Sequence, residues 1–331
     1  MRQLYPLLMT PSLDPRPWGR LDLRPIYDAP CKEKIGESWL TGDNCTAQNG
    51  ELAGKSLAEI SARFQREFIG DAPQAPDRFP LLMKFLFPQE KLSVQVHPDD
   101  ADARSLGEPW GKTECWYVVH AEPGAELGLG LRKGVTRAEF EQAVQENRAE
   151  ELLNWIKVSA GDMIYVAGGT VHTLGPGSII VETQQQSDTT FRLYDYGRPR
   201  ELHLEQGLRV IKENVASGRV RPQPFAKFGS NGNRRQALVA SRYFVVERFE
   251  LNAGQEFEPL DGNSSAQIIV ATAGAASVLA ADCDPVTFKK GDAVVIPAAI
   301  DSFHIQPQGQ VSFAKSHVPG VHVPEPVTVS D

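Results

Sequence analysis

Most of the chain alternates short apolar runs with turns, and three segments instead place apolar residues at helical spacing. The first, residues 56–70, opens with the capping-box pair Ser56 and Glu59 and ends at a glycine. Its apolar positions are three or four residues apart, at Leu57, Ile60, Phe64 and Phe68. This pattern predicts one amphipathic helix near the N-terminal end.

Two further helices are expected on similar grounds. The capping-box pair Thr136 and Glu139 predicts a helix that runs to about Trp155. A third helix is expected from His203 to Asn214. The rest of the chain consists of short β-branched runs closed by turns, which indicates a mainly β protein.

Two distant segments resemble each other. Residues 161–174 (GDMIYVAGGTVHTL) and 291–305 (GDAVVIPAAIDSFHI) each have Gly-Asp, an apolar strand, a small-residue turn and a late histidine. We interpret them as a duplicated β module, with a boundary in the Pro/Gly/Asn-rich residues 218–235. The second copy differs because Asp301 and Ser302 separate its turn from the histidine.

Composition supports a β-rich globular protein. Hydrophobic residues make up 41% and charged residues 23%, which excludes bulk disorder and collagen-like structure. The 28 glycines and 24 prolines are spread along the 331 residues and suit many strands and turns better than a helical bundle. This length suits two domains or one large domain.

The charge balance bears on the kind of partner, and the cysteines bear on disulfide bonding. With 34 Lys+Arg against 42 Asp+Glu, the net charge of −8 argues against nucleic acid, although a locally basic pocket could still take an anionic substrate. The 4 cysteines form no C-x-x-C pair and do not resemble a disulfide framework. No apolar run approaches the roughly 18 residues of a membrane span, and residues 1–10 make a poor signal peptide, so we expect a cytoplasmic protein without a membrane partner.

Three segments carry candidate metal ligands. Alternation in LSVQVHP (92–98) places Ser93, Gln95 and His97 on one strand face, which is also a common pattern for a solvated face. In KTECWYVV (112–119), Lys112, Glu114 and Trp116 share a face, so Glu114 pairs with Lys112, binds a cation, or does both in one pocket.

The third segment, GGTVH (168–172), has two glycines that allow a tight turn before His172. A histidine of this kind is often only a core or surface residue. With His97 and Glu114, however, it completes a His/Glu/His set that suits zinc with an open coordination position. Gln95 adds a neutral oxygen on the face of His97.

A fourth segment, residues 179–199, carries charged residues of a different kind. Glu182 and Gln184 share a strand face, and Arg192 and Arg198 follow. Guanidinium groups suit binding of a phosphate or of an oxyanion, whereas a solvated charged hairpin is the simpler explanation.

Together these segments resemble the type I mannose-6-phosphate isomerase family of cupins. The matching stretches are LSVQVHP (92–98), GKTECWYV (111–118), GGTVHTLGPG (168–177) and ETQQQSDTTFRLYDYGR (182–198), with weaker matches at PWG (17–19) and IGESW (35–39). Their order and spacing match over roughly residues 15–215, and the length resembles the short bacterial form. The resemblance implies two cupin (jelly-roll) β-barrels with a few peripheral helices. It implies a catalytic domain at 1–229, with N-terminal strands and inserted helices, and a second barrel without a metal site at 230–331.

The resemblance also implies an activity and a set of site residues. The activity is the metal-dependent interconversion of mannose 6-phosphate and fructose 6-phosphate through a cis-enediol(ate). One zinc ion per chain would be held by the residues at the family's ligand positions, Gln95, His97, Glu114 and His172. Arg192 falls on the family's active-site arginine, and Ser93, Lys112 and Arg198 fall at or near phosphate-binding positions.

The sequence does not decide which group carries the proton, because Glu182, Lys112 or a zinc-bound water could each serve. The chemistry asks for a positioned acid or base, a cation near the developing negative charge and an anchored phosphate. The resemblance thus implies a small-molecule sugar phosphate as the partner, and we expect a monomer or homodimer.

Three other functions agree with part of this residue pattern. An iron-dependent dioxygenase shares the His/Glu/His set but gives Lys112, Arg192 and Arg198 no purpose. A sugar-binding or regulatory cupin would keep the metal without turnover. A storage-type cupin would not need the polar strand faces around residues 93–97 and 112–114.

Overall fold

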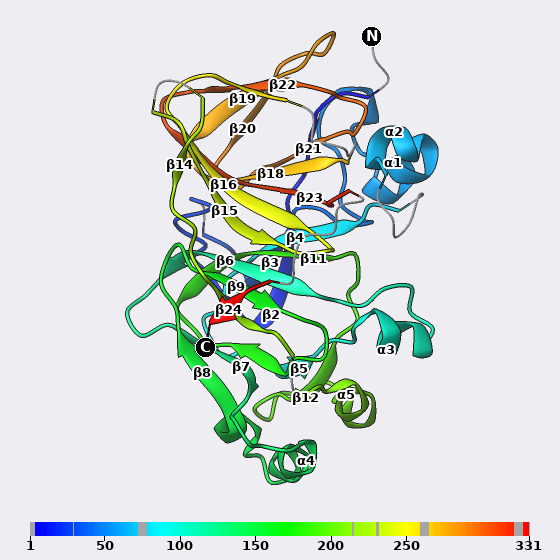
Figure 1. The fold of residues 1–331 in the computed structure, drawn as a ribbon, viewed down its shortest axis with the longest axis vertical. Helices are drawn as coiled ribbons and strands as arrows, with labels where there is room; N and C mark the ends of the chain where they lie inside the picture. Colours follow the sequence, from blue (N-terminus) through cyan, green and yellow to red (C-terminus); the bar gives the residue numbers. More distant parts are fainter. Residues whose placement is uncertain are drawn as a thin grey trace.

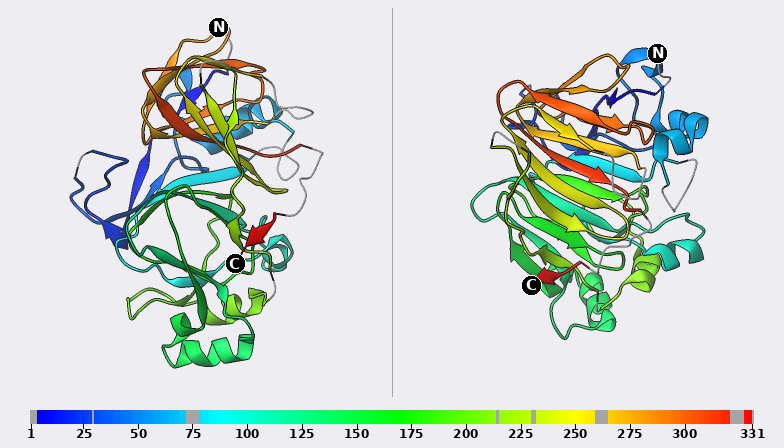
Figure 2. Two further views of the ribbon diagram at one scale, coloured as in Figure 1. Left: turned by 60° about the vertical axis from the view of Figure 1, so that its left-hand side comes forward. Right: turned by 45° about the horizontal axis from the view of Figure 1, so that its top comes forward.

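The protein is mainly β, as the sequence predicts, and the strands of its described residues form four sheets (Figure 1). The computed structural model describes residues 4–28, 30–71, 78–213, 215–229, 232–258, 265–320 and 327–330. The sheets form two pairs, one mostly from the first two thirds of the chain and one from the last third (Figures 1 and 2).

The first pair combines a sheet of eight strands with a sheet of five. In spatial order the larger sheet contains β2 (Ser12–Arg20), β3 (Ile35–Trp39), β4 (Leu81–Leu86), β11 (Ser178–Gln185), β6 (Glu114–Ala121), β9 (Met163–Val166), β13 (Gly218–Val220) and β24 (Val329–Ser330). The smaller sheet contains β12 (Phe191–Tyr194), β5 (Val94–Val96), β10 (His172–Leu174), β7 (Glu126–Leu131) and β8 (Leu153–Lys157).

The second pair combines seven strands with four. The larger sheet contains β1 (Leu7–Leu8), β21 (Ala293–Ile296), β18 (Gln267–Ala273), β23 (Val311–His317), β16 (Val245–Leu251), β15 (Arg234–Ala240) and β14 (Ala226–Lys227). The smaller sheet contains β17 (Gln255–Phe257), β22 (Phe303–Pro307), β19 (Ala275–Leu279) and β20 (Val286–Lys289).

The two pairs repeat one strand order. The series β3-β4-β11-β6-β9 in the first large sheet corresponds to β15-β16-β23-β18-β21 in the second, and β5-β10-β7-β8 corresponds to β17-β22-β19-β20. The two similar segments noted in the sequence occupy matching places, because 161–174 supplies β9 and β10 whereas 291–305 supplies β21 and β22. Gly161 and Gly291 open these segments with φ of 97° and 92°, a backbone conformation that glycine adopts without strain.

Three apolar layers hold the sheets together. One lies inside the first pair and includes Trp116 and Ile180, and another lies inside the second pair and includes Phe249 and Phe313. The third lies between the two large sheets, where Phe85 packs in one layer with residues of β16 and β18. Since both faces of the central strands of the large sheets are buried, strands such as β4 and β18 appear in the sequence as nearly continuous apolar runs.

The helices lie outside the sheets and differ partly from expectation. The first predicted helix forms as α1 (Leu57–Phe64) and α2 (Arg66–Ile69), and Ser56 and Glu59 make both capping-box hydrogen bonds. The third forms as α5 (Leu204–Val210) and ends earlier than predicted, because Ile211 is already extended; its predicted last residue, Asn214, lies outside the described residues.

The second predicted helix is too long. It begins at the expected capping box, but α4 covers only Arg137–Gln145 and is followed by a 3₁₀ turn, η2 (Ala149–Leu152). Trp155 lies in β8, because this stretch pairs with β7 at the edge of the five-stranded sheet. Pairing and burial at the sheet edge override the local helical pattern. Two short elements, η1 (Gly50–Leu52) and α3 (Asp100–Ser105), were not predicted.

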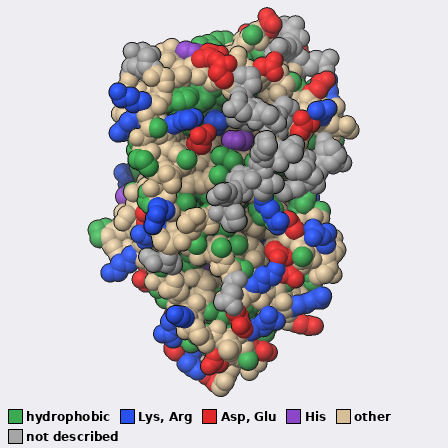
Figure 3. Space-filling model, viewed as in Figure 1, with side chains coloured by type: hydrophobic (Ala, Val, Ile, Leu, Met, Phe, Trp, Pro, Cys, Tyr) green, Lys and Arg blue, Asp and Glu red, His purple; other side chains and the backbone are tan. Residues whose placement is uncertain are grey.

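Each end of the described chain joins the other pair of sheets. Near the beginning, β1 pairs with β21, and near the end, β24 pairs with β13. Charged side chains of both signs are interspersed over the face seen in Figure 3. No helix among the described residues is long and apolar enough to span a membrane.

Candidate active site

A cavity of about 400 Å³ opens between the two sheets of the first pair. Its lining includes side chains from strands of both sheets: Trp18, Glu37, Lys84, Ser93, Gln95, Lys112, Trp116, His172, Glu182 and Arg192. Six of these are residues that the sequence singled out for the site, Ser93, Gln95, Lys112, His172, Glu182 and Arg192. The fold therefore brings together predicted residues that are up to about 100 positions apart in the chain, from Ser93 to Arg192.

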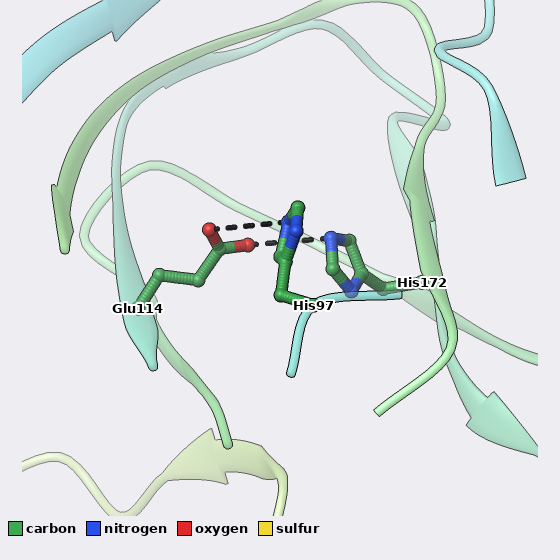
Figure 4. Close-up of side chains that lie close together, drawn as sticks. All are labelled: His97, Glu114 and His172. Atoms are coloured by element: carbon green, nitrogen blue, oxygen red, sulfur yellow. Dashed lines mark ion pairs between the residues drawn. The ribbon is translucent and has the colours of Figure 1, made fainter. Parts of the chain in front are cut away.

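Three potential metal ligands meet beside the cavity (Figure 4). The ligand atoms of His97, Glu114 and His172 all lie within 4.8 Å of one another, and each of these side chains is 1% exposed. Glu114 Oε2 is 3.6 Å from His97 Nε2, and Glu114 Oε1 is 3.3 Å from His172 Nε2. The carboxylate and both Nε2 atoms thus face one point.

The opposite side of each imidazole ring is held by the backbone. Nδ1 of His97 lies 2.9 Å from the carbonyl oxygen of Thr189, and Nδ1 of His172 lies 2.9 Å from that of Thr170. A carbonyl only accepts, so Nδ1 donates in both rings and each Nε2 carries the lone pair. This tautomer is the one that a metal ligated through Nε2 requires.

Burial keeps both histidines neutral. It lowers the pKa of His172 to about 4 and, with the charge of Lys112, it lowers the pKa of His97 well below its ordinary value. A neutral imidazole is the form that binds metal.

Glu114 is held in a site that disfavours an isolated carboxylate. Burial, followed by the nearby charge of Glu182, raises the pKa of Glu114 to about 8. Its Oε2 is buried, and no donor from the described part of the chain makes a hydrogen bond to it. A divalent cation would compensate this charge, so the residues fit a metal ion with nitrogen and oxygen ligands.

Two neighbours extend this cluster. Gln95 Nε2 lies 3.2 Å from His172 Nε2, and Ser93 Oγ donates to Gln95 Oε1 at 3.2 Å. Rotating the amide by half a turn would present its oxygen to the cluster. Lys112 Nζ lies 3.1 Å from His97 Nε2 and 3.4 Å from Glu114 Oε2, so this lysine borders both the ligands and the cavity.

A second charged group, which the sequence reasoning missed in part, also lines the cavity. Lys84 Nζ pairs with Glu182 Oε2 at 3.1 Å and with Glu37 Oε2 at 3.3 Å, and Trp116 Nε1 donates to Glu182 Oε1 at 2.9 Å. A single lysine in the apolar run 81–86 was the available signal, because a buried ammonium requires a carboxylate partner.

These pairs set the charge states of the group. Burial alone would lower the pKa of Lys84, but Glu182 and Glu37 outweigh it and raise that pKa. Burial would raise the pKa of Glu182 and Glu37, but Lys84 is the strongest opposing charge for both and lowers each pKa, for Glu37 to about 2. The two carboxylates and the ammonium are therefore all ionised near neutral pH.

The arginines occupy different places. Arg192 lines the cavity, donates from Nη1 to the carbonyl oxygen of Glu201 at 2.7 Å, and has a pKa lowered by burial and by Arg200. Arg16 and Arg200, which the sequence reasoning did not single out, also line it. Arg200 is held by two hydrogen bonds of 2.6 and 2.7 Å to Asp195.

Arg198, expected near the phosphate, lies outside the cavity lining. Its guanidinium donates to the carbonyl oxygen of Lys91 at 2.6 Å and pairs with Asp195 at 3.1 Å. Because Asp195 also holds Arg200, one buried carboxylate fixes both arginines, and only Arg200 reaches the cavity.

Comparison with known proteins identifies the family. A family model described as the phosphomannose isomerase type I catalytic domain matches residues 9–113. A mannose-6-phosphate isomerase of Streptococcus mutans is 33% identical over 324 residues, which cover 94% of this chain and 98% of the relative. The chain belongs to the type I phosphomannose isomerase family.

Solved structures of phosphomannose isomerases share the fold over nearly the whole length. The mannose 6-phosphate isomerase of Bacillus subtilis is 31% identical and covers 95% of this chain and 99% of its own, with a TM-score of 0.82. A mannose 6-phosphate isomerase solved with zinc bound is 15% identical and covers 95% of this chain and 99% of its own, with a TM-score of 0.74. The latter supports the fold alone.

Proposed function

We propose that this phosphomannose isomerase family member interconverts mannose 6-phosphate and fructose 6-phosphate and depends on one zinc ion per chain. The observation that carries the proposal is the buried His97/Glu114/His172 cluster beside a cavity whose lining includes five cationic side chains, Arg16, Lys84, Lys112, Arg192 and Arg200. A metal site beside cationic groups suits a substrate that has a reacting carbonyl and a phosphate.

The residues that would hold zinc are His97, Glu114 and His172, with the amide oxygen of Gln95 as a fourth ligand. When bound, zinc would supply a Lewis acid that stabilises negative charge on substrate oxygens. The Nδ1 hydrogen bonds to Thr189 and Thr170 keep the imidazole rings oriented for this role.

We assign the phosphate to the cationic part of the lining. Ser93 and Lys112 stay in the proposal, and Arg200 joins Arg198 as a candidate because Arg200 reaches the cavity and is oriented by Asp195. Anchoring the phosphate away from the reacting carbons orients C1 and C2. Arg192 would stabilise the oxygens of the cis-enediol(ate).

We assign the proton transfer between C1 and C2 to Glu182. Its lowered pKa leaves it ionised at neutral pH, so it can accept a proton, and its Oε1 is held in place by Trp116 Nε1. Lys112 borders the metal ligands, and in this assignment it binds the substrate and leaves the proton transfer to Glu182.

The second pair of sheets, in our proposal, is a duplicated cupin barrel that has lost the site. The division is 1–229 for the catalytic barrel and 230–331 for the second barrel. Strand register supports the duplication: Glu182 is the cross-strand partner of Lys84, and Lys315 is the partner of Glu247 at the corresponding place, with the charges exchanged. By the same register Gln267 stands where the first barrel has Glu114.

The test is a coupled assay of mannose 6-phosphate conversion, before and after chelation, with metal analysis of the same sample. We expect turnover that chelation abolishes and zinc restores, with about one zinc per chain. Unphosphorylated mannose serves as the control and should react far more slowly. Bound metal without turnover would overturn the proposed isomerase activity and favour a binding protein. Absence of metal would overturn the proposed set of metal ligands. The cytoplasmic location and the monomeric or homodimeric state stay predictions.

A further inference from the structure

The second pair of sheets reaches the loops around the metal ligands through one turn. Residues 241–244 join β15 to β16, and Ser241 Oγ accepts hydrogen bonds from the backbone N–H groups of Tyr243 and Phe244, each at 3.2 Å. Phe244 is fully buried between the two large sheets, and Tyr243 is 4% exposed. The turn therefore holds the Tyr243 side chain in one place.

The Tyr243 side chain contacts Asp100, the first residue of α3 (Asp100–Ser105). The Tyr243 hydroxyl donates to Asp100 Oδ2 at 2.9 Å, and Arg242 Nη2 lies 3.4 Å from the same oxygen. Burial raises the pKa of Tyr243 to about 12, so its hydroxyl keeps the proton that it donates. The other oxygen, Asp100 Oδ1, accepts from Gly111 N–H at 3.1 Å and from Gln185 Nε2 at 3.0 Å.

Both segments that meet at Asp100 supply residues to the metal cluster. Asp100 follows His97 by three residues, and Gln185 Oε1 accepts from the N–H of Thr113, between Lys112 and Glu114, at 2.9 Å. Close packing leaves no slack here, because a Cβ on Gly111 would lie 2.5 Å from the carbonyl carbon of Asp99. A shift of Asp100 would therefore move the segments that carry His97 and Glu114.

We infer that Tyr243 and Asp100 are positioning residues, through which the second pair of sheets fixes the segments 97–100 and 111–114 around the metal cluster. The geometry explains how a unit whose described residues hold no metal-ligand set contributes to the site. The inference rests on the proposed function for its effect on turnover, but the link itself can be measured in metal-free protein.

The test compares Tyr243→Phe, which removes only the hydroxyl, with the matched control Tyr27→Phe. The Tyr27 hydroxyl also joins the two large sheets, since it donates to the carbonyl oxygen of Gly291 at 3.0 Å and contacts Ser38 Oγ at 2.8 Å, but it makes no contact with Asp100. In metal-free protein we expect the amides of Gly111 and Thr113 to exchange hydrogen faster in Tyr243→Phe and at the wild-type rate in Tyr27→Phe.

In metal-loaded protein, Tyr243→Phe should weaken zinc binding and lower kcat about 10-fold, with KM unchanged because the tyrosine does not line the cavity. Substituting cobalt for zinc should give an altered ligand-field spectrum in this variant only. Asp100→Asn should have the same effects, and the double variant should be little worse than either single one, because all break the same link.

Unchanged exchange at Gly111 and Thr113 in both Tyr243→Phe and Asp100→Asn would overturn the inference, as would equal effects from Tyr27→Phe. If the wild-type protein lacks isomerase activity, the proposed function fails, but the exchange experiment still decides whether the link positions these segments.

Discussion

Buried charged residues of the cavity such as Lys84 and Glu182 are stable because each has a partner of opposite charge. Lys84 is 4% exposed and lies between Glu37 and Glu182, and Glu37 also accepts from Trp39 Nε1 at 2.8 Å and from Arg16 Nε at 3.3 Å. Removing one partner would leave a buried charge uncompensated, which costs more than the pair itself contributes.

Glu37 makes the stability of the protein dependent on pH. Its pKa is lowered from 4.5 to about 2, so its ionised form stabilises the fold fully above pH 4.5, and this contribution is lost as pH falls toward 2. We expect the difference in unfolding free energy between wild type and Glu37→Gln to shrink by about 2 kcal/mol between pH 7 and pH 3. Urea titrations at both pH values measure it, and an equal difference at both would contradict the prediction.

The two histidines should be needed for metal retention. Changing either His97 or His172 to Ala should remove bound metal and activity together, because each supplies one of few ligands. Arg192→Ala is the control: it should keep the metal and lower kcat roughly 100-fold. Metal analysis beside steady-state kinetics distinguishes the two, and full metal content in both histidine variants would rule out the ligand assignment.

The arginines fixed by Asp195 allow a direct comparison. Arg200→Ala should raise KM for mannose 6-phosphate about 10-fold or more, because a guanidinium in the cavity binds phosphate strongly. Arg198→Ala should change KM less, since its guanidinium contacts the backbone of Lys91 instead of the cavity. A larger effect from Arg198→Ala would indicate that the phosphate binds at Arg198, as the family resemblance implies.

At the scale of elements, the site depends on turns that let strands approach closely. Gly168, in the turn between β9 and β10, lies against Asp99, and a Cβ there would be 2.6 Å from the Asp99 Cα atom. The neighbouring Gly169 has φ of 91° and donates to the carbonyl oxygen of His97 at 2.7 Å. This turn therefore ties the segment of His97 to that of His172.

Gly168→Ala should displace the His97 segment and weaken metal binding about 10-fold or more. Gly161→Ala, at the start of β9, is the matched control: a Cβ there meets nothing within 4 Å, but φ is 97°. The control should cost about 1 kcal/mol of stability through backbone strain and keep the metal. Isothermal titration with zinc checks both variants, and equal affinities would contradict the prediction.

Local patterns in the sequence were sufficient for some elements and not for others. Capping boxes located the starts of α1 and α4, and strand alternation placed Lys112 and Trp116 on the face that lines the cavity, with Glu114 paired to Lys112. The helix predicted as far as Trp155 was too long because pairing with β7 decides that stretch, and pairing is a contact that local spacing does not contain. Arg200 was missed for a similar reason, since its place depends on Asp195 as a buried anchor.

At the scale of the whole molecule, the repeat was visible in the sequence as two similar segments, but its extent was not. In the described part of the chain, nine strands from β3 to β11 recur as β15 to β23 in the same spatial order, whereas the resemblance noted in the sequence covers the β9–β10 and β21–β22 segments. A sheet order constrains which faces are buried and leaves most residue identities free.

The two pairs of sheets are held together non-covalently at both ends of the described chain, because β1 and β24 each pair with a strand of the other pair of sheets. If an engineered protease site in residues 221–225 were cut, the fragments would still share β1–β21, β13–β24 and the apolar layer between the large sheets. We expect two bands on a denaturing gel and one peak, at the uncut size, on gel filtration. Separation of the fragments without denaturant would contradict this. Nicked protein would then be a working enzyme in two pieces, able to be reassembled from fragments made apart.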